Sequence, residues 1–119
     1  MIQNKIIAAI EESPAFGYGV FGDRLFIGGS YPHNLLLEIF CQFGIVVGGG
    51  LLITLLFVFI DAIIKSNGHF ERLFVFMLII MVIVKLMLSG SYLHETWLFF
   101  LIGVCLQIMR KKKTRTSEL

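Results

Sequence analysis

The sequence has few charged residues, cysteines and histidines. Asp, Glu, Lys and Arg make up 15% of its 119 residues, and it contains 2 cysteines and 3 histidines. Cys41 and Cys105 both lie in apolar segments, so we interpret them as small buried hydrophobic residues rather than as a disulfide. No group of Cys and His residues has the spacing of a zinc site, and we expect no metal and no cofactor.

Two common motifs are also absent. Gly17 and Gly19 do not belong to a dinucleotide fingerprint, because no predicted strand precedes them and no third glycine has the right offset. The apolar run after Lys5 covers only Ile6 to Ile10, shorter than the roughly 7–15 residues of a signal-peptide core. We therefore expect no cleaved leader, and nothing in the sequence indicates a nucleic-acid partner.

What the sequence has in abundance is apolar residues, which make up 57% of the chain and give a mean hydropathy of +0.88. This exceeds the usual apolar fraction of a soluble domain and indicates an all-α membrane protein. The most apolar part, residues 43–60, is interrupted only by Thr54 and would measure about 27 Å as a helix, close to the thickness of a hydrocarbon core. We expect three transmembrane helices, at about 35–64, 72–88 and 92–109.

The first 33 residues have a different pattern. Apolar residues share one face at helical spacing and predict a short amphipathic helix over residues 2–12, lying on the membrane surface or against protein: Ile2, Ile6, Ala9 and Ile10. Residues 13–33 are rich in glycine and aromatic residues, which indicates a loop or a pair of short extended pieces. The aromatic rings either anchor this loop at the membrane interface or stack on sugars.

The basic residues indicate an orientation. A cluster lies near the C-terminus: Arg110, Lys111, Lys112, Lys113 and Arg115. By the positive-inside rule, the tail 110–119 and the turn near residues 65–72 should be cytoplasmic, and we expect the polar tail to be disordered. Three spans then place residues 1–33 and the turn 89–96 outside. Lys85 either extends to the headgroups or contacts an anionic lipid.

A polar group stands where the first predicted span begins. Pro32 disfavours helix before it, and Asn34 is a favoured N-cap, because its side-chain oxygen can accept a free backbone N–H of the first turn. His33 and Glu38 lie close to these unpaired N–H groups and to the positive end of the helix dipole, which favours an anion. Further along, Gly48–Gly50 would let a neighbouring helix approach closely in lipid.

The order of these residues is informative. A His33-Asn34 pair is followed by the aliphatic run 35–37, by Glu38, and then by Gly44, Ile45 and Gly48. The preceding stretch 13–19, Ser-Pro-Ala-Phe-Gly-Tyr-Gly, has the form Pro-x-x-Gly-x-Gly. Over roughly residues 6–50 the chain resembles the signature of the O-antigen polymerase and O-antigen ligase superfamily.

The resemblance implies a function. Members of this family transfer undecaprenyl-diphosphate-linked oligosaccharide outside the bacterial inner membrane, in the assembly of lipopolysaccharide or capsule. It implies a catalytic role for His33, whose ordinary pKa is near neutrality, and for Glu38, which would orient His33 or position the acceptor. Asn34 is a candidate substrate-binding residue. Arg24 is a second candidate because its charge suits phosphate, and not because it matches an arginine of the family.

Simpler interpretations of the same residues stay open. Asn34 would only cap the helix, and His33 would only lie at the interface. Asp23 and Arg24 would form a surface ion pair. His94 and Glu95 are expected on the same side as His33, and they are either solvated there or line the same site.

Family members have on the order of ten or more spans. The resemblance therefore implies that this chain is the C-terminal portion of such an enzyme, inactive alone. It would be a fragment, or a subunit that completes a site with the upstream part of a split polymerase. The alternative is a small non-catalytic membrane scaffold or partner-binding protein. Polymerase and ligase are not distinguished.

Overall fold

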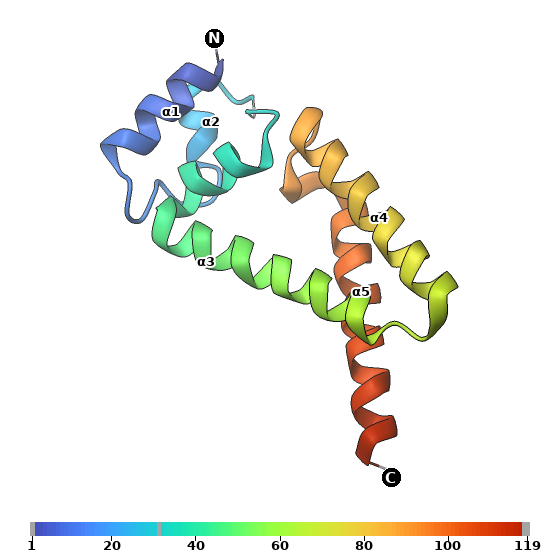
Figure 1. The fold of residues 1–119 in the computed structure, drawn as a ribbon. Coiled ribbons are helices and arrows are strands. Elements are labelled where there is room, and N and C mark those ends of the chain that lie inside the picture. The colour runs from blue at the N-terminus through green and yellow to red at the C-terminus, as the bar shows by residue number, and fades with distance from the viewer. Residues whose placement is uncertain (1, 31, 118–119) are drawn as a thin grey trace.

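The computed structural model describes residues 2–30 and 32–117, and these form helices and no strands (Figure 1). In chain order they are α1 (Ile2–Glu12), α2 (Gly22–Phe26), α3 (Leu35–Lys65), α4 (Gly68–Leu88), the 3-10 helix η1 (Tyr92–His94) and α5 (Thr96–Ser117). The prediction of an all-helical chain is confirmed. The amphipathic helix over 2–12 and the helix over 35–64 lie where the sequence predicts them.

Two local predictions are wrong. The segment 13–33 contains the short helix α2, so it is not a loop or a pair of extended pieces throughout. The tail was expected to be disordered, yet α5 continues as a helix to Ser117. The reason is the composition of this tail, since the Lys and Arg residues after Met109 are good helix formers and neither glycine nor proline interrupts them.

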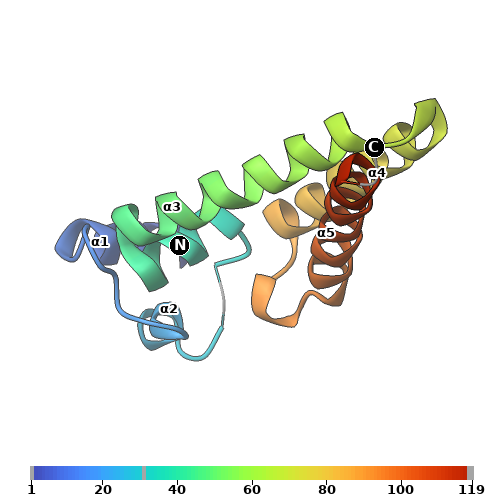
Figure 2. The same cartoon turned by 90° about the horizontal axis from the view of Figure 1, so that it is seen from below.

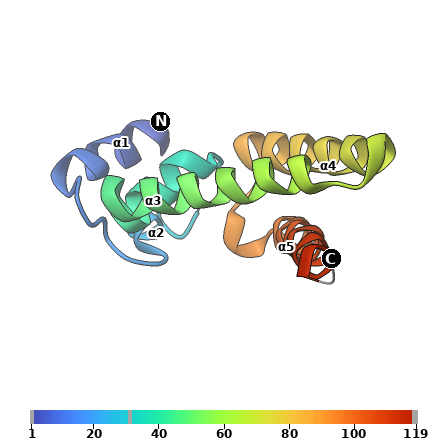
Figure 3. The same cartoon turned by 60° about the horizontal axis from the view of Figure 1, so that its bottom comes forward.

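α3 is not one straight helix. Gly44 has φ 71° and ψ 179°, a conformation open essentially to glycine alone, and it divides the helix in two. A Cβ atom on Gly48 would lie 3.0 Å from Cγ2 of Ile39, although a straight helix would separate these residues by about 13 Å. The chain therefore folds sharply back on itself at Gly44, as Figures 1 and 3 show.

The break in α3 leaves backbone groups without helical partners, and the loop before α2 supplies them. Tyr18 N donates to Cys41 O at 3.0 Å, and Gly19 N donates to Gln42 O at 2.7 Å. In the opposite direction, Ile45 N donates to a loop carbonyl. Broken helices in membranes need such substitutes, because lipid offers no hydrogen bonds.

The two segments, the loop before α2 and the break in α3, come very close at this point. Ile45 N lies 2.7 Å from its acceptor, the carbonyl of Pro14. A Cβ atom on Gly17 would lie 2.5 Å from Gly44 N, and one on Gly44 would lie 2.3 Å from Ala15 O. The two glycine-containing motifs of the sequence, residues 13–19 and 44–48, are thus halves of a single structural unit.

The three long helices pack through one apolar core. Its buried members come from α3, α4 and α5: Leu35, Ile39, Phe59, Ala62, Val75, Val82, Leu86, Leu98, Leu101, Cys105 and Ile108. Figure 2 shows α1 and α2 grouped on one side and α4 and α5 on the other, with α3 joining them. A smaller cluster of Ile6, Ala9 and Cys41 holds α1 against the first part of α3.

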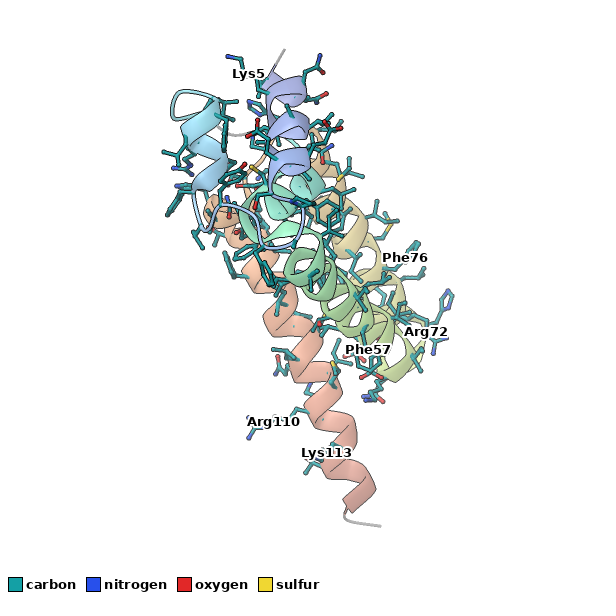
Figure 4. The ribbon with its side chains drawn as sticks, turned by 90° about the vertical axis from the view of Figure 1, so that its left-hand side faces the viewer. Lys5, Phe57, Arg72, Phe76, Arg110 and Lys113 are labelled. Atoms are coloured by element: carbon teal, nitrogen blue, oxygen red, sulfur yellow. The ribbon has the colours of Figure 1, made fainter. Side chains whose placement is uncertain are left out.

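Outside this core, the long helices expose many large apolar side chains. For example, Ile53 on α3 is 70% exposed, Met77 on α4 is 64% exposed and Phe100 on α5 is 53% exposed. Basic residues mark the two ends of the molecule in Figure 4, with Lys5 at one end and Arg110 and Lys113 at the other. An apolar surface of this extent is typical of a protein covered by lipid or by further protein.

Within the described residues, one helix is long and apolar enough to cross a membrane, and this is α3, of which 17% of the most apolar window is buried. Its part beyond Gly44, residues 45–65, measures about 31 Å at 1.5 Å per residue. In α4 the charges of Glu71, Arg72 and Lys85 shorten the uncharged stretch to residues 73–84. In α5 a basic cluster begins at residue 110. Of the three predicted spans, the described residues therefore support one, which is α3.

Candidate functional site

Polar side chains are buried where α2, the first part of α3 and the turn after α4 meet. Asp23, Glu38 and Gln42 are 0% exposed, Ser91 is 5% exposed and Glu95 is 6% exposed. Burying a polar group is unfavourable unless it is hydrogen-bonded, so such a cluster persists only where its members satisfy one another. Their contacts define the site.

Glu38 connects the start of α3 with the turn after α4. The Asn34 cap begins the helix, and Glu38 lies one turn later, facing inward. Its Oε1 accepts a hydrogen bond from Ser91 Oγ, and its Oε2 accepts one from Tyr92 N at 3.2 Å. Hydrogen bonds to a charged acceptor are stronger than neutral ones, so this carboxylate holds the turn firmly.

Gln42, one turn further along α3, makes two more hydrogen bonds. Its Nε2 donates to Asp23 Oδ1 at 2.6 Å, and its Oε1 accepts from Tyr92 Oη at 2.6 Å. Burial, together with the carboxylates of Glu38 and Asp23, raises the pKa of Tyr92 to about 12. The phenol therefore keeps its proton at neutral pH and remains a donor.

A pocket of about 430 Å³ lies beside this network. Its lining combines positive side chains with small residues and one acid: Arg24, Gly29, Lys85, Ser89, Gly90, Ser91, His94 and Glu95. Lys85 Nζ lies 2.9 Å from Glu95 Oε2. The Arg24 guanidinium stacks on the ring of Phe21, 4.4 Å from its centroid, and its buried Nε has no hydrogen-bond partner among the described residues. The charges suit an anionic ligand.

The predicted site residues are distributed unevenly around the pocket. Arg24 lines it, and Glu38 lies directly behind the lining residue Ser91. Asn34 caps α3 as predicted, because its Oδ1 accepts from Leu36 N at 3.0 Å and from Leu37 N at 3.3 Å. His33 is exposed at the start of α3 with φ 52°, and it is not one of the residues that line the pocket.

Sequence reasoning missed part of this site. Asp23 is fully buried and bonded to Gln42, so interpreting Asp23 and Arg24 as a surface ion pair is wrong. Glu95 is also buried, and it forms an ion pair with Lys85 instead of being solvated. One signal pointed to the network: Gln42 is an isolated amide in the apolar stretch between Glu38 and Thr54.

Comparisons with known proteins add no family assignment. The chain matches no protein-family model, no curated protein and no solved structure.

Proposed function

We propose that this chain is the C-terminal membrane portion of an O-antigen polymerase- or ligase-like glycosyltransferase. Its substrate would be an undecaprenyl-diphosphate-linked oligosaccharide used in lipopolysaccharide or capsule assembly. The observation that carries the proposal is the pocket lined by Arg24, Lys85 and His94, beside the buried Glu38 of the motif that resembles this family. The contact between segments 13–19 and 42–45 supports it, since both belong to that resemblance.

The chemistry of the pocket fits a diphosphate leaving group. Transfer of a sugar from a lipid diphosphate increases the charge on the phosphate oxygens, and preorganised cations lower the barrier to that step. Arg24 and Lys85 both line the pocket, and Lys85 is half exposed beside its partner Glu95, so both side chains can contact an anion. Glu38 has both oxygens engaged by the turn 91–92, which fits a role in placing the pocket wall.

The surroundings of the pocket fit a lipid-linked substrate. An apolar groove of about 550 Å³ lies between α3 and α4, and its lining reaches Leu35 and Met87 near the pocket. A ligand with an anionic head and a long hydrocarbon chain would be bound in this way, with the head in the pocket and the chain in the groove. In the proposal, exposed His33 handles the proton of the acceptor hydroxyl.

We further propose that α4 and α5 cross the bilayer beside α3, with residues 1–33 outside and the tail inside. Long basic side chains such as Lys85 extend toward the headgroups, which reconciles the charges of α4 with a span. The protein would lie in the bacterial inner membrane. Cysteine variants at Leu25 and Lys111, in a Cys41→Ala, Cys105→Ala background, test this. We expect an impermeant thiol reagent to label position 25 and not position 111 in cells whose outer membrane is permeabilised.

Activity is tested in a strain that lacks its O-antigen polymerase. The 119 residues alone should give no lipopolysaccharide ladder, because the pocket offers two cations and other spans must complete the site. Coexpression with the upstream part of a split polymerase should restore the ladder. His33→Ala should abolish it again, whereas His69→Ala, which changes an exposed histidine at the start of α4, should not.

The alternative outcomes have distinct meanings. A ladder from the 119 residues alone would make this chain a minimal transferase rather than a portion of one. Wild-type activity of His33→Ala would leave that histidine without a catalytic role. If no upstream part restores transfer while the chain inserts normally, the function would be that of a non-catalytic scaffold.

A further inference from the structure

The pocket has two walls that come from distant parts of the chain. Arg24 belongs to α2, whereas Lys85 and His94 flank the turn after α4. We infer that a hydrogen-bonded bridge through Gln42 and Tyr92 sets the separation of these two walls and thereby the fit of the pocket to a diphosphate. Gln42 and Tyr92 are positioning residues on this account. The choice of diphosphate as the ligand rests on the proposed function, and the bridge itself does not.

The bridge connects a neighbour of each wall. At one end, Asp23 precedes Arg24 in α2 and accepts from Gln42 Nε2 at 2.6 Å. At the other end, Tyr92 follows the pocket residue Ser91 and donates its phenolic proton to Gln42 Oε1 at 2.6 Å. Because Asp23 and Gln42 are 0% exposed, water does not compete for the hydrogen bond between them, and the bond to Tyr92 is part-buried.

The direction of the bridge is fixed by chemistry. An ionised Asp23 only accepts hydrogen bonds, so the amide nitrogen of Gln42 must face it. The amide oxygen then faces Tyr92, and the phenol must donate. A reversed amide would place its oxygen against the Asp23 carboxylate and lose that hydrogen bond, while its nitrogen could still donate to the Tyr92 hydroxyl, so the observed orientation is the one that makes both bonds.

The two walls are held very differently. The turn after α4 has further ties, since Glu38 accepts from Ser91 and from Tyr92 N. On the α2 side, the second carboxylate oxygen of Asp23 and the Nε of Arg24 have no hydrogen-bond partner among the described residues. The Asp23–Gln42 bond is therefore the side-chain hydrogen bond that places this wall. The Tyr92 hydroxyl holds the Gln42 amide in the orientation that faces Asp23. Removing this hydroxyl should let the amide turn away from Asp23, which releases Arg24 and leaves the other wall in place.

Binding of inorganic pyrophosphate, measured by calorimetry on the whole chain in nanodiscs, tests this. Tyr92→Phe removes one hydroxyl and should weaken binding roughly tenfold, the equivalent of one hydrogen bond. Tyr18→Phe is the matched control, because it removes a hydroxyl whose bond to Glu12 is exposed and 3.4 Å long. This variant should bind as wild type does. Arg24→Ala should weaken binding at least as much as Tyr92→Phe.

The double variant separates positioning from direct contact. If Tyr92 acts through Arg24, then adding Tyr92→Phe to Arg24→Ala should cause little further loss, because coupled residues are not additive. Losses that multiply would overturn the inference, as would wild-type affinity in Tyr92→Phe.

A second measurement does not depend on the ligand. Spin labels at Leu25 on α2, which is 80% exposed, and at Thr96 at the start of α5 report the distance across the pocket. In the Cys41→Ala, Cys105→Ala background, the distance distribution should broaden with Tyr92→Phe and stay narrow with Tyr18→Phe. An unchanged distribution would overturn the bridge. If wild type fails to bind pyrophosphate, the proposed ligand is wrong, and these distances still decide the inference.

Discussion

The two ends of the molecule are built in opposite ways. At the end that carries α1, α2 and the turn after α4, polar side chains such as Asp23, Glu38 and Gln42 are buried and hydrogen-bonded. Toward the other end of α3 and α4, large apolar side chains such as Ile53 and Phe57 are exposed, at 70% and 63%. The first end contains a buried polar network, and the other end consists mainly of apolar side chains, many of which are exposed.

This difference shows which interactions specify each part of the fold. Directional hydrogen bonds and close backbone contacts determine the polar end, so single atoms should matter there. The apolar half depends on contact area with its own helices and with the surrounding lipid or protein, so it should tolerate small changes. Matched substitutions at the two ends test the contrast directly, and the largest effect is expected at the reversal of α3.

Gly44→Ala should destabilise the chain by more than about 3 kcal/mol, because it combines strained backbone with a steric clash. The new Cβ would lie 2.3 Å from Ala15 O at φ 71°. Gly49→Ala in the apolar half is the control, since nothing lies within 4 Å of its added Cβ. It should be neutral or stabilise by roughly 0.5–1 kcal/mol through helix propensity. Denaturant unfolding in detergent, followed by the fluorescence of Trp97, measures both, and equal effects would remove the contrast.

Glu38→Met should cost about 2–3 kcal/mol, because it keeps the side-chain length and leaves the Ser91 and Tyr92 donors buried without an acceptor. Glu71→Met is the matched change in the first turn of α4, where the Glu71 carboxylate accepts a hydrogen bond from the exposed Asn67 N. It should change stability by less than about 0.5 kcal/mol. Glu38→Gln should lie between the two, since an amide still offers one acceptor. A cost for Glu71→Met as large as that for Glu38→Met would contradict the comparison.

The helices could be predicted from sequence because their signals are local. Apolar run length gave the extent of α3, and the Asn34 cap gave its start. The reversal at Gly44 could not be predicted, because glycine in an apolar segment is equally consistent with packing between helices. Gly48 was assigned to such packing, yet it accommodates Ile39 of its own helix, and nothing lies within 4 Å of the Cβ positions of Gly49 and Gly50.

The candidate site was only partly predictable for a related reason. Glu38 was proposed from the motif and Arg24 from its charge, which suits phosphate. Arg24 lines the pocket, and Glu38 accepts from the lining residue Ser91. Asp23 gave no sign of burial, because an acid next to an arginine is usually solvated. Asp23 is hydrogen-bonded to Gln42, and the two meet because the loop before α2 packs against α3 at its break. Contacts between residues this far apart in sequence are a property of the tertiary structure.

The smallest expected effect concerns two asparagines at equivalent helix positions. Asn34 is the N-cap of α3, and its side chain accepts from Leu36 N and Leu37 N. Asn67 is the N-cap of α4, and its side chain makes no capping hydrogen bond. Asn34→Ala should therefore cost about 1 kcal/mol, and Asn67→Ala only a few tenths. Thermal unfolding by circular dichroism in the same detergent resolves this difference. Equal losses of stability would show that the capping hydrogen bonds of Asn34 do not account for its effect. The contrast between the two ends of the molecule would then not extend to helix caps.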